Sequence, residues 1–282
     1  MLSSLTDLLP SMRSVKNFFL TNALLFAFAA GEYVAVEQCV LLPCLAAVSI
    51  VKNVAMMKNI EHFVKDKPWI GGDTRKVPSP AYRGEFWFNL IRTSLVESFT
   101  KFVVYNYVVR AGAVEYWRDL LLFVPYSLAF EIIFDFFHYW SHRLLHIYPF
   151  LYRNVHKHHH KFPYPTPIIA FYQSPIDLLL TNTLPSLAAL FLLPSASKWL
   201  VCLLFTYKTH TEISGHTGRD IPSTPSFPQC IWIPRVLKFA LHTEDHDLHH
   251  SLNNCNYSKR FAIWDKLFGT FKQRSVENEQ ER

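Results

Sequence analysis

The chain has 282 residues, of which 50% are hydrophobic, 16% aromatic and only 18% charged. The apolar residues come in long blocks, which is typical of membrane proteins rather than of soluble domains. The net charge of +6 comes mainly from Lys and Arg in short segments between these blocks, such as Lys58 to Arg83. That distribution suits the positive-inside rule and contact with anionic headgroups, and it argues against nucleic-acid binding.

Two membrane helices are expected at the N-terminus. An apolar run from Phe18 to Ala30 resembles a signal peptide, but a second apolar block from Val40 to Met57 follows directly. We therefore predict a retained helical hairpin. The loop from Lys58 to Gly84 carries the first cluster of positive charge, which places it in the cytosol.

Four further apolar blocks are expected to form the core of a helical bundle. The block from Phe86 to Val109 is interrupted by charged residues, which suits a helix packed among other helices. The block from Lys198 to Tyr207 is short for a full crossing of roughly 20 residues. It therefore either extends to His210 or is partly re-entrant. The blocks are Phe86 to Val109, Leu120 to Trp140, Ser174 to Leu193 and Lys198 to Tyr207.

Histidines form the main chemical feature, and half of the chain's 14 histidines lie between Phe134 and Lys161. Three of them recur every fourth residue and would form a stripe on one helix face. Two later segments share the pattern HxxHH, which in a helix can offer three nitrogens to one region. The predicted metal ligands are His138, His142 and His146, then His156, His159 and His160, and finally His216, His246, His249 and His250.

These ligands outnumber what a single metal can use, since a closed zinc site takes four, so we predict two metal ions. Imidazole suits iron, zinc and copper, and a redox role with O2 selects iron. Four acidic neighbours are expected to orient the rings or to serve as ligands themselves. They are Asp135, Glu212, Asp245 and Asp247.

Other histidines and the cysteines are interpreted more simply. His62 and His158 are expected to be exposed, while His210 and His242 are left open as ligands. The five cysteines are odd in number and form no CxxC pair, so neither a zinc knuckle nor a disulfide framework is predicted.

The three histidine segments resemble the boxes of the membrane fatty acid hydroxylase and sterol desaturase superfamily. The residues after His216 and the final stretch Trp264 to Thr270 are similar to those of C-4 methylsterol oxidases and cholesterol 25-hydroxylases. Arg219 stands where those enzymes usually have an aromatic residue, and the C-terminus lacks a dilysine retrieval signal. The matching boxes are Asp135 with His138 to His146, His156 to His160, and His246 to His250.

The resemblance implies a non-haem di-iron centre that faces the cytosol at the endoplasmic reticulum membrane. It also implies that two iron ions, which zinc can replace in a purified form, activate O2 with electrons from cytochrome b5 or its reductase. The substrate would be a lipid from the bilayer, with a sterol as the leading hypothesis. Because the boxes do not encode the substrate, fatty acyl, aldehyde or other isoprenoid lipids, and desaturation instead of hydroxylation, remain alternatives.

A metal transporter is an alternative from another class. Transporter ligands should lie within spans near the bilayer midplane, whereas these histidines lie at span ends and beyond. Four aromatic or apolar residues beside the boxes would line a path from the bilayer or anchor the chain at its interface. They are Tyr139, Trp140, Phe171 and Tyr172.

The expected fold is an all-α integral membrane protein. It has four core transmembrane helices, an N-terminal hairpin and a cytosolic histidine-rich cap that holds a dinuclear metal site. We divide the chain into the hairpin and its cytosolic loop (1–84), a fatty acid hydroxylase-like catalytic domain (85–272) and a charged tail (273–282).

Overall fold

The computed structural model describes residues 12–38, 41–72, 78–109, 115–221 and 237–274. Over these ranges the chain is mostly helical, with connecting turns and two isolated β-bridges but no strand, which confirms the predicted all-α class for this part of the chain. The main α-helices are α2 (Met12–Gln38), α3 (Leu42–Val64), α4 (Arg83–Val103), α5 (Tyr116–Ile147), α6 (Pro149–Leu151), α7 (Pro175–Leu178), α8 (Leu184–Leu192), α9 (Lys198–Gly215), α11 (Thr243–Leu252) and α12 (Ile263–Leu267). Shorter 3-10 and π-helical turns are η1 (Pro80–Tyr82), η2 (Val104–Val108), η3 (Tyr152–His156), η4 (His159–Lys161), η5 (Pro167–Phe171) and η6 (Leu179–Thr183).

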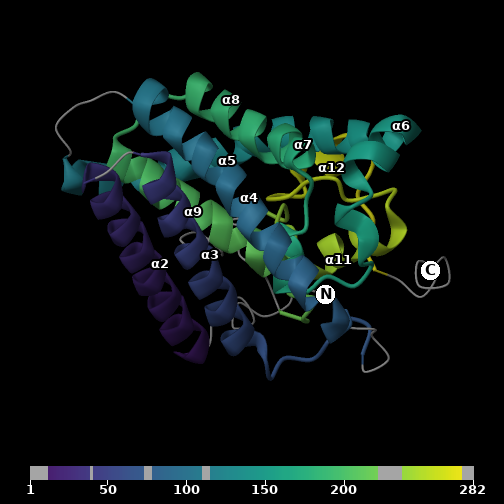
Figure 1. The fold of residues 1–282 in the computed structure, drawn as a ribbon. Coiled ribbons are helices and arrows are strands. Elements are labelled where there is room, and N and C mark those ends of the chain that lie inside the picture. Colours follow the sequence, from purple (N-terminus) through teal and green to yellow (C-terminus); the bar gives the residue numbers. More distant parts are fainter. Residues whose placement is uncertain (1–11, 39–40, 73–77, 110–114, 222–236, 275–282) are drawn as a thin grey trace.

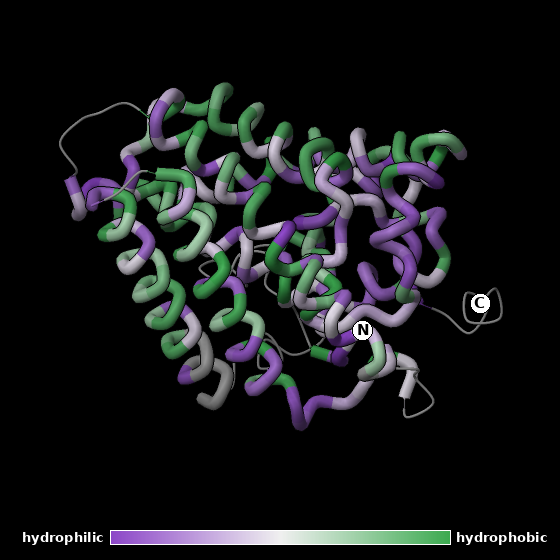
Figure 2. The backbone as a smooth tube through the Cα atoms, in the orientation of Figure 1, coloured by the Kyte–Doolittle hydropathy of each residue, from purple (hydrophilic) through white to green (hydrophobic). Residues whose placement is uncertain are grey.

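The long helices pack into one bundle, and the histidine-bearing segments lie at one end of it (Figure 1). Within the bundle, α2 packs against α9, α3 against α4, and α5 against α8. Hydrophobic residues dominate the long helices, whereas hydrophilic residues gather at the end that contains α11 (Figure 2). We call that end the histidine cap, made of residues 149–174, 216–221 and 237–274.

Three helical stretches in the described part of the chain are long and apolar enough to cross a membrane. They are Phe19–Gln38, Tyr116–Ile147 and Pro175–Leu192. Leu121 is 80% exposed and Phe191 84% exposed, as expected for side chains that face lipid. The other predicted spans correspond to α3, α4 and α9, and their crossing remains a prediction.

Charged side chains inside the bundle connect α2, α3 and α4. Glu32 on α2 pairs with Lys52 on α3 and with Lys101 on α4, where Nζ and Oε1 are 2.8 Å apart. All three side chains are almost fully buried, and Tyr105 donates a further hydrogen bond to the same carboxylate. Polar groups in these helices therefore point toward neighbouring helices, where they are paired.

Helix α5 fixes the cap to the bundle through Asp135. This buried carboxylate accepts backbone N–H bonds from Lys259 (2.7 Å), Arg260 (3.1 Å) and Phe261 (3.0 Å). Three charge-assisted bonds to successive residues hold the C-terminal segment against the same helix that contains the first histidine box.

Arg219 links the loop after α3 to the cap. Its guanidinium lies 3.4 Å from the centroid of the Trp69 ring, and it donates to the Lys67 carbonyl at 2.6 Å. Residues 69 and 219 also form an isolated antiparallel bridge. The arginine that departs from the pattern of the sterol oxidases thus has a packing role, since it stacks on a tryptophan from another segment.

Candidate metal centre

The predicted ligands converge into two groups of imidazole nitrogens. Within each group, the candidate ligand atoms all lie within 4.8 Å of one another. Group 1 consists of His142, His146, His156, His160 and His249. Group 2 consists of His159, His216, His246 and His250.

Each HxxHH segment supplies both groups, which differs from the expectation that each would serve one region. In the second segment, His156 and His160 belong to group 1 and His159 to group 2. In the third, the arrangement is reversed. His246 and His250 belong to group 2 and His249 to group 1. In the third segment, which lies in α11, the physical reason is that residues i and i+4 share a helix face, whereas the adjacent i+3 ring points about 100° away from i+4.

Backbone carbonyls and one carboxylate orient the rings. The Nδ1 atom of His142 donates to the Tyr257 carbonyl at 2.8 Å, and that of His156 to Asp177 at 2.9 Å. The Nδ1 atom of His216 donates to the Glu212 carbonyl at 2.7 Å, and that of His249 to Cys255 at 2.7 Å. Because these oxygens only accept, Nδ1 holds the proton and Nε2 presents a lone pair.

This proton arrangement tests whether the groups fit a metal. The Nε2 atoms of His142 and His156 are 3.0 Å apart, as are those of His216 and His246. For His142 and His156, whose Nδ1 atoms both donate, the two Nε2 lone pairs face and repel each other, whereas a cation bound by both removes the repulsion. The buried Nε2 atoms of His249 and His250 have no hydrogen-bond partner in the described structure. Both groups therefore have the donor chemistry of a metal site.

Burial favours the neutral form of most of the rings in the two groups. It lowers the pKa of His216 to about 4 and that of His249 to about 3. For His159, His160, His246 and His250, burial and the neighbouring imidazoles hold the pKa well below its ordinary value. Neutral imidazole is the form that binds metals, so the rings are ready for ligation at pH 7.

The remaining histidines lie outside both groups. His138 was predicted as a ligand and belongs to neither group. Its Nδ1 donates to the Thr181 carbonyl at 2.6 Å and its ring stacks on Phe134, so ligation by its Nε2 stays a prediction. His158 is half-buried rather than exposed, and it stacks on Tyr172 at 4.1 Å. His242 caps the N-terminus of α11. His62 is exposed, as predicted, and His210 belongs to neither group.

The acidic neighbours hold the cap together in ways that the sequence did not indicate. Asp135 binds backbone, as described above, and Asp245 completes the capping box with His242. The carboxylate of Glu212 pairs with Lys259 at 2.7 Å, and Asp247 lies 3.3 Å from Arg274. Here the carbonyl of Glu212, and not its carboxylate, accepts from the His216 ring.

Asp177 is a candidate site residue that the sequence interpretation missed. It is fully buried and its carboxylate binds His156, so it occupies the position of a carboxylate that orients a metal-binding histidine. A signal for it was present, because it is an acidic residue just inside an apolar stretch, where ionisable side chains are costly and functional.

Most of the aromatic residues beside the boxes are buried inside the protein. Tyr139, Phe171 and Tyr172 are buried at 0%, 2% and 0% exposure, so these three do not anchor the chain at a membrane interface. Tyr139 stacks on Phe268 and donates to or accepts from Thr270 at 3.1 Å. Trp140 is 36% exposed and is the one of the four that can contact lipid.

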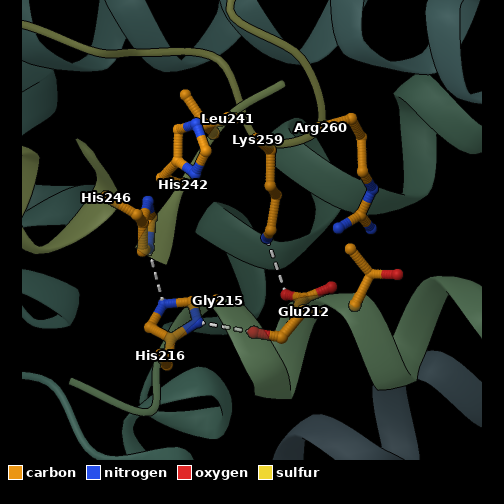
Figure 3. A pocket seen from close by; sticks show the side chains of 9 residues that line it. Glu212, Gly215, His216, Leu241, His242, His246, Lys259 and Arg260 are labelled. Carbon is orange, nitrogen blue, oxygen red and sulfur yellow. Dashed lines mark hydrogen bonds and ion pairs between the residues drawn. The ribbon is translucent and has the colours of Figure 1, made fainter. Parts of the chain in front are cut away.

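A small cavity of about 20 Å³ lies beside group 2. Figure 3 shows His216 and His246 on one side of it and Lys259, Arg260 and Glu212 on the other. The two cations are held in place, since Lys259 pairs with Glu212 and Arg260 with Glu131 at 2.6 Å. Group 2 thus has open volume next to its rings, bordered by fixed positive charge.

Comparison with known proteins agrees with this geometry. The sequence model of the fatty acid hydroxylase family matches residues 127–270, which contain all three histidine segments. This match spans half of the chain, and the protein belongs to that family. No solved structure matches the chain.

Curated relatives include several lipid-modifying enzymes. The chain is 34% identical over 176 residues to a fatty acid hydroxylase of Lecanicillium sp, covering 59% of this chain and 46% of the relative. It is 34% identical over 158 residues to a methylsterol monooxygenase of Aspergillus fumigatus (54% and 48%), and 28% identical over 170 residues to a sphinganine C4-monooxygenase of Arabidopsis thaliana (59% and 61%). The chain thus spans about half to three-fifths of the length of these relatives.

Proposed function

We propose that the protein is a membrane-bound di-iron monooxygenase that hydroxylates or oxidises a C–H bond of a sterol. The observation that carries this proposal is the pair of imidazole groups at the histidine cap, in each of which the candidate ligand nitrogens lie within 4.8 Å of one another. Two iron ions bound there would supply O2 activation and oxidation of an unactivated C–H bond. The net reaction takes up O2, two electrons and two protons, and it releases water together with the oxidised lipid.

The chain's own residues contribute binding, orientation and exclusion of water. Group 1 would hold one metal and group 2 the other, with Asp177 and the backbone carbonyls of Tyr257, Glu212 and Cys255 fixing the ring orientations. The buried surroundings keep bulk water away from both groups. Lys259 and Arg260 place positive charge at the cavity beside group 2.

The same residues support oxidation of another lipid as a second candidate function. Curated relatives of similar identity are named for a fatty acid, a methylsterol, a sphinganine and a very-long-chain aldehyde. A fatty acyl, aldehyde or other isoprenoid substrate is therefore the alternative. The proposed setting is the endoplasmic reticulum membrane with the histidine cap in the cytosol. Cytochrome b5 or its NAD(P)H-dependent reductase would donate the electrons, and the substrate would arrive from the bilayer.

Metal analysis joined to a reconstituted assay tests the proposal. Protein expressed with iron available should contain about two irons per chain, and one metal or fewer would contradict the dinuclear centre. In vesicles with NADH, cytochrome b5 and its reductase, addition of a 4-methylsterol should cause O2 consumption and an oxidised sterol. Oxidation of a fatty alcohol, acyl lipid or aldehyde with no sterol product would select the alternative. His249→Ala protein is the matched inactive control.

A further inference from the structure

The last turns of α5 have two different faces. The inner side holds the buried side chains of His138, His142 and Leu145. On the opposite side, four exposed hydrophobic residues recur at spacings of three or four, which places them on one face of the helix. We call this set the outer face of α5, and it consists of Phe137, Trp140, Leu144 and Ile147. The turns that supply His142 to group 1 therefore expose an apolar stripe on their other side.

Two neighbouring elements extend this apolar surface. Tyr148 is exposed and Phe150 is 74% exposed where α5 passes into α6, at the edge of the histidine cap (Figure 1). The short helix α12 packs against α5, and its Leu267 is 66% exposed. The rings of Trp140 and Phe268 meet edge to face with centroids 4.9 Å apart, so α12 lies directly beside the outer face. Exposed apolar surface built by several elements marks a contact with a membrane or with another protein.

The length of α5 favours a membrane. Its 32 residues extend about 48 Å, whereas the hydrocarbon core of a bilayer is about 30 Å thick and the whole bilayer with its headgroup regions about 40–45 Å. At the average tilt of membrane helices, about 20°, a helix of this length spans the whole bilayer. The exposed Trp117 in the first turn suits one interface. The outer face of α5 then lies at the depth of the opposite headgroups.

The charges around this surface also suit a bilayer. Residues 136–157 contain no Asp or Glu, but they include Arg143, Arg153 and Lys157. The Arg143 guanidinium lies 5.8 Å from the centroid of the Trp140 ring, while Arg153 and Lys157 are exposed. Tryptophan and tyrosine are enriched at membrane–water interfaces, and nearby cations attract anionic headgroups. On a helix that is itself a candidate span, this combination favours lipid over a protein partner.

We propose that the outer face of α5, together with Tyr148, Phe150 and Leu267, lies in the headgroup region of a phospholipid bilayer. The histidine cap then rests against the membrane surface. Because a helix with its side chains is about 10–12 Å wide, His142 lies only about one helix width from the lipid. A lipid can therefore approach group 1 from the side of α5 without crossing water. The placement rests on the membrane setting of the proposed function, and not on its metals or its substrate.

Depth-dependent fluorescence quenching in nanodiscs tests this placement. A genetically incorporated fluorescent amino acid replaces Ile147 or Phe150 in the full chain. The nanodiscs consist of phosphatidylcholine and phosphatidylserine, with a nitroxide quencher attached to the lipid either near the headgroup or deep in the acyl chain. At both positions we expect quenching by the nitroxide near the headgroup to be several-fold stronger than by the deep nitroxide or by dissolved iodide.

Two reference positions calibrate the depth. Leu184 is exposed within the candidate span Pro175–Leu192, so a label there should be quenched most by the deep nitroxide. Gln273 is exposed on the histidine cap and lies outside every candidate span of the described chain. A label at Gln273 should be quenched by iodide and by neither nitroxide.

Labels on two elements, α5 and α6, keep the test decisive if one variant does not fold. Quenching by iodide alone at Ile147 and Phe150, while Leu184 responds to the deep nitroxide, would overturn the placement, because the outer face would then contact water. Quenching mainly by the deep nitroxide at both positions would also overturn it, since the surface would lie in the hydrocarbon core. If Leu184 showed no quenching by lipid either, the membrane setting of the proposed function would itself be wrong.

Discussion

The two histidine groups differ in donor number, burial and surroundings, although the same two HxxHH segments feed both. Group 1 has five rings, among which His146 is only partly buried, and the carboxylate of Asp177 accepts a hydrogen bond from His156 in this group. Group 2 has four fully buried rings, with a cavity and the cations Lys259 and Arg260 beside them. More donors and a nearby negative charge favour tighter metal binding in group 1. Open volume favours access of small molecules to group 2.

Removal of one ring from each group should have the largest effect. We expect His249→Ala in group 1 and His159→Ala in group 2 each to lower turnover more than about 100-fold, because each deletes a predicted ligand. Metal analysis should show loss from one group only, and membrane insertion should be unchanged. Exposed His62→Ala is the control. Wild-type activity in both group variants would refute the assignment.

Asp177→Asn tests the support that is specific to group 1. We expect metal affinity at group 1 to fall about 10–100-fold, since loss of an orienting carboxylate has that effect at metal-binding histidines. Group 2 should retain its metal, which a chelator titration resolves as two separate release steps. Asp119→Asn is a suitable comparison, because this carboxylate accepts from Ser197 and belongs to neither group. If Asp177→Asn weakened metal binding equally at both groups, the expected difference in metal affinity between group 1 and group 2 would be wrong.

Acid should destabilise the metal-free protein through both groups. The pKa of His216 is lowered to about 4 and that of His249 to about 3 by burial, while the unfolded chain titrates near 6.5. The unfolded state therefore binds more protons, and stability that is full above pH 6.5 is lost as pH falls toward 4. Each of these two rings should lower the free energy of unfolding by about 1 kcal/mol when the pH falls from 7.5 to 5.5.

Thermal unfolding of chelator-treated protein at those two pH values measures this loss. His216→Gln should reduce the pH dependence, because glutamine does not titrate. A melting temperature that rises on acidification would contradict the sign.

The smallest effect is expected at His138. His138→Gln should leave the metal content of both groups unchanged, because the ring lies in neither group. A glutamine can keep the hydrogen bond to the Thr181 carbonyl, so activity should fall only a few-fold. Loss of one metal would restore His138 to the ligand set and extend group 1.

Much of this centre was accessible from sequence because imidazole spacing follows helix geometry. The four-residue spacing of His142 and His146 predicted one face of α5, and repeated HxxHH segments predicted a dinuclear arrangement. The helical class followed equally from the long apolar blocks.

The division of rings between the groups could not be read from spacing alone. Residues 152–161 form a π-turn followed by a 3-10 turn, so a regular helical period does not apply there. The partners of Asp135 and Asp177 lie far away in sequence or in a different segment, and no local pattern encodes them. Arg219 is a similar case, since its role depends on Trp69, 150 positions earlier along the chain.

The position of α11 near the C-terminal end of the described chain has a consequence for biosynthesis. Group 1 needs His249, and group 2 needs His246 and His250. All three candidate membrane spans precede these residues, and the Asp135 carboxylate has its three backbone donors only after residue 261. Neither group can be complete on a nascent chain that still lacks α11. Any metal bound by these groups would therefore be loaded after translation of the cap, and truncated chains released earlier would lack both complete histidine groups.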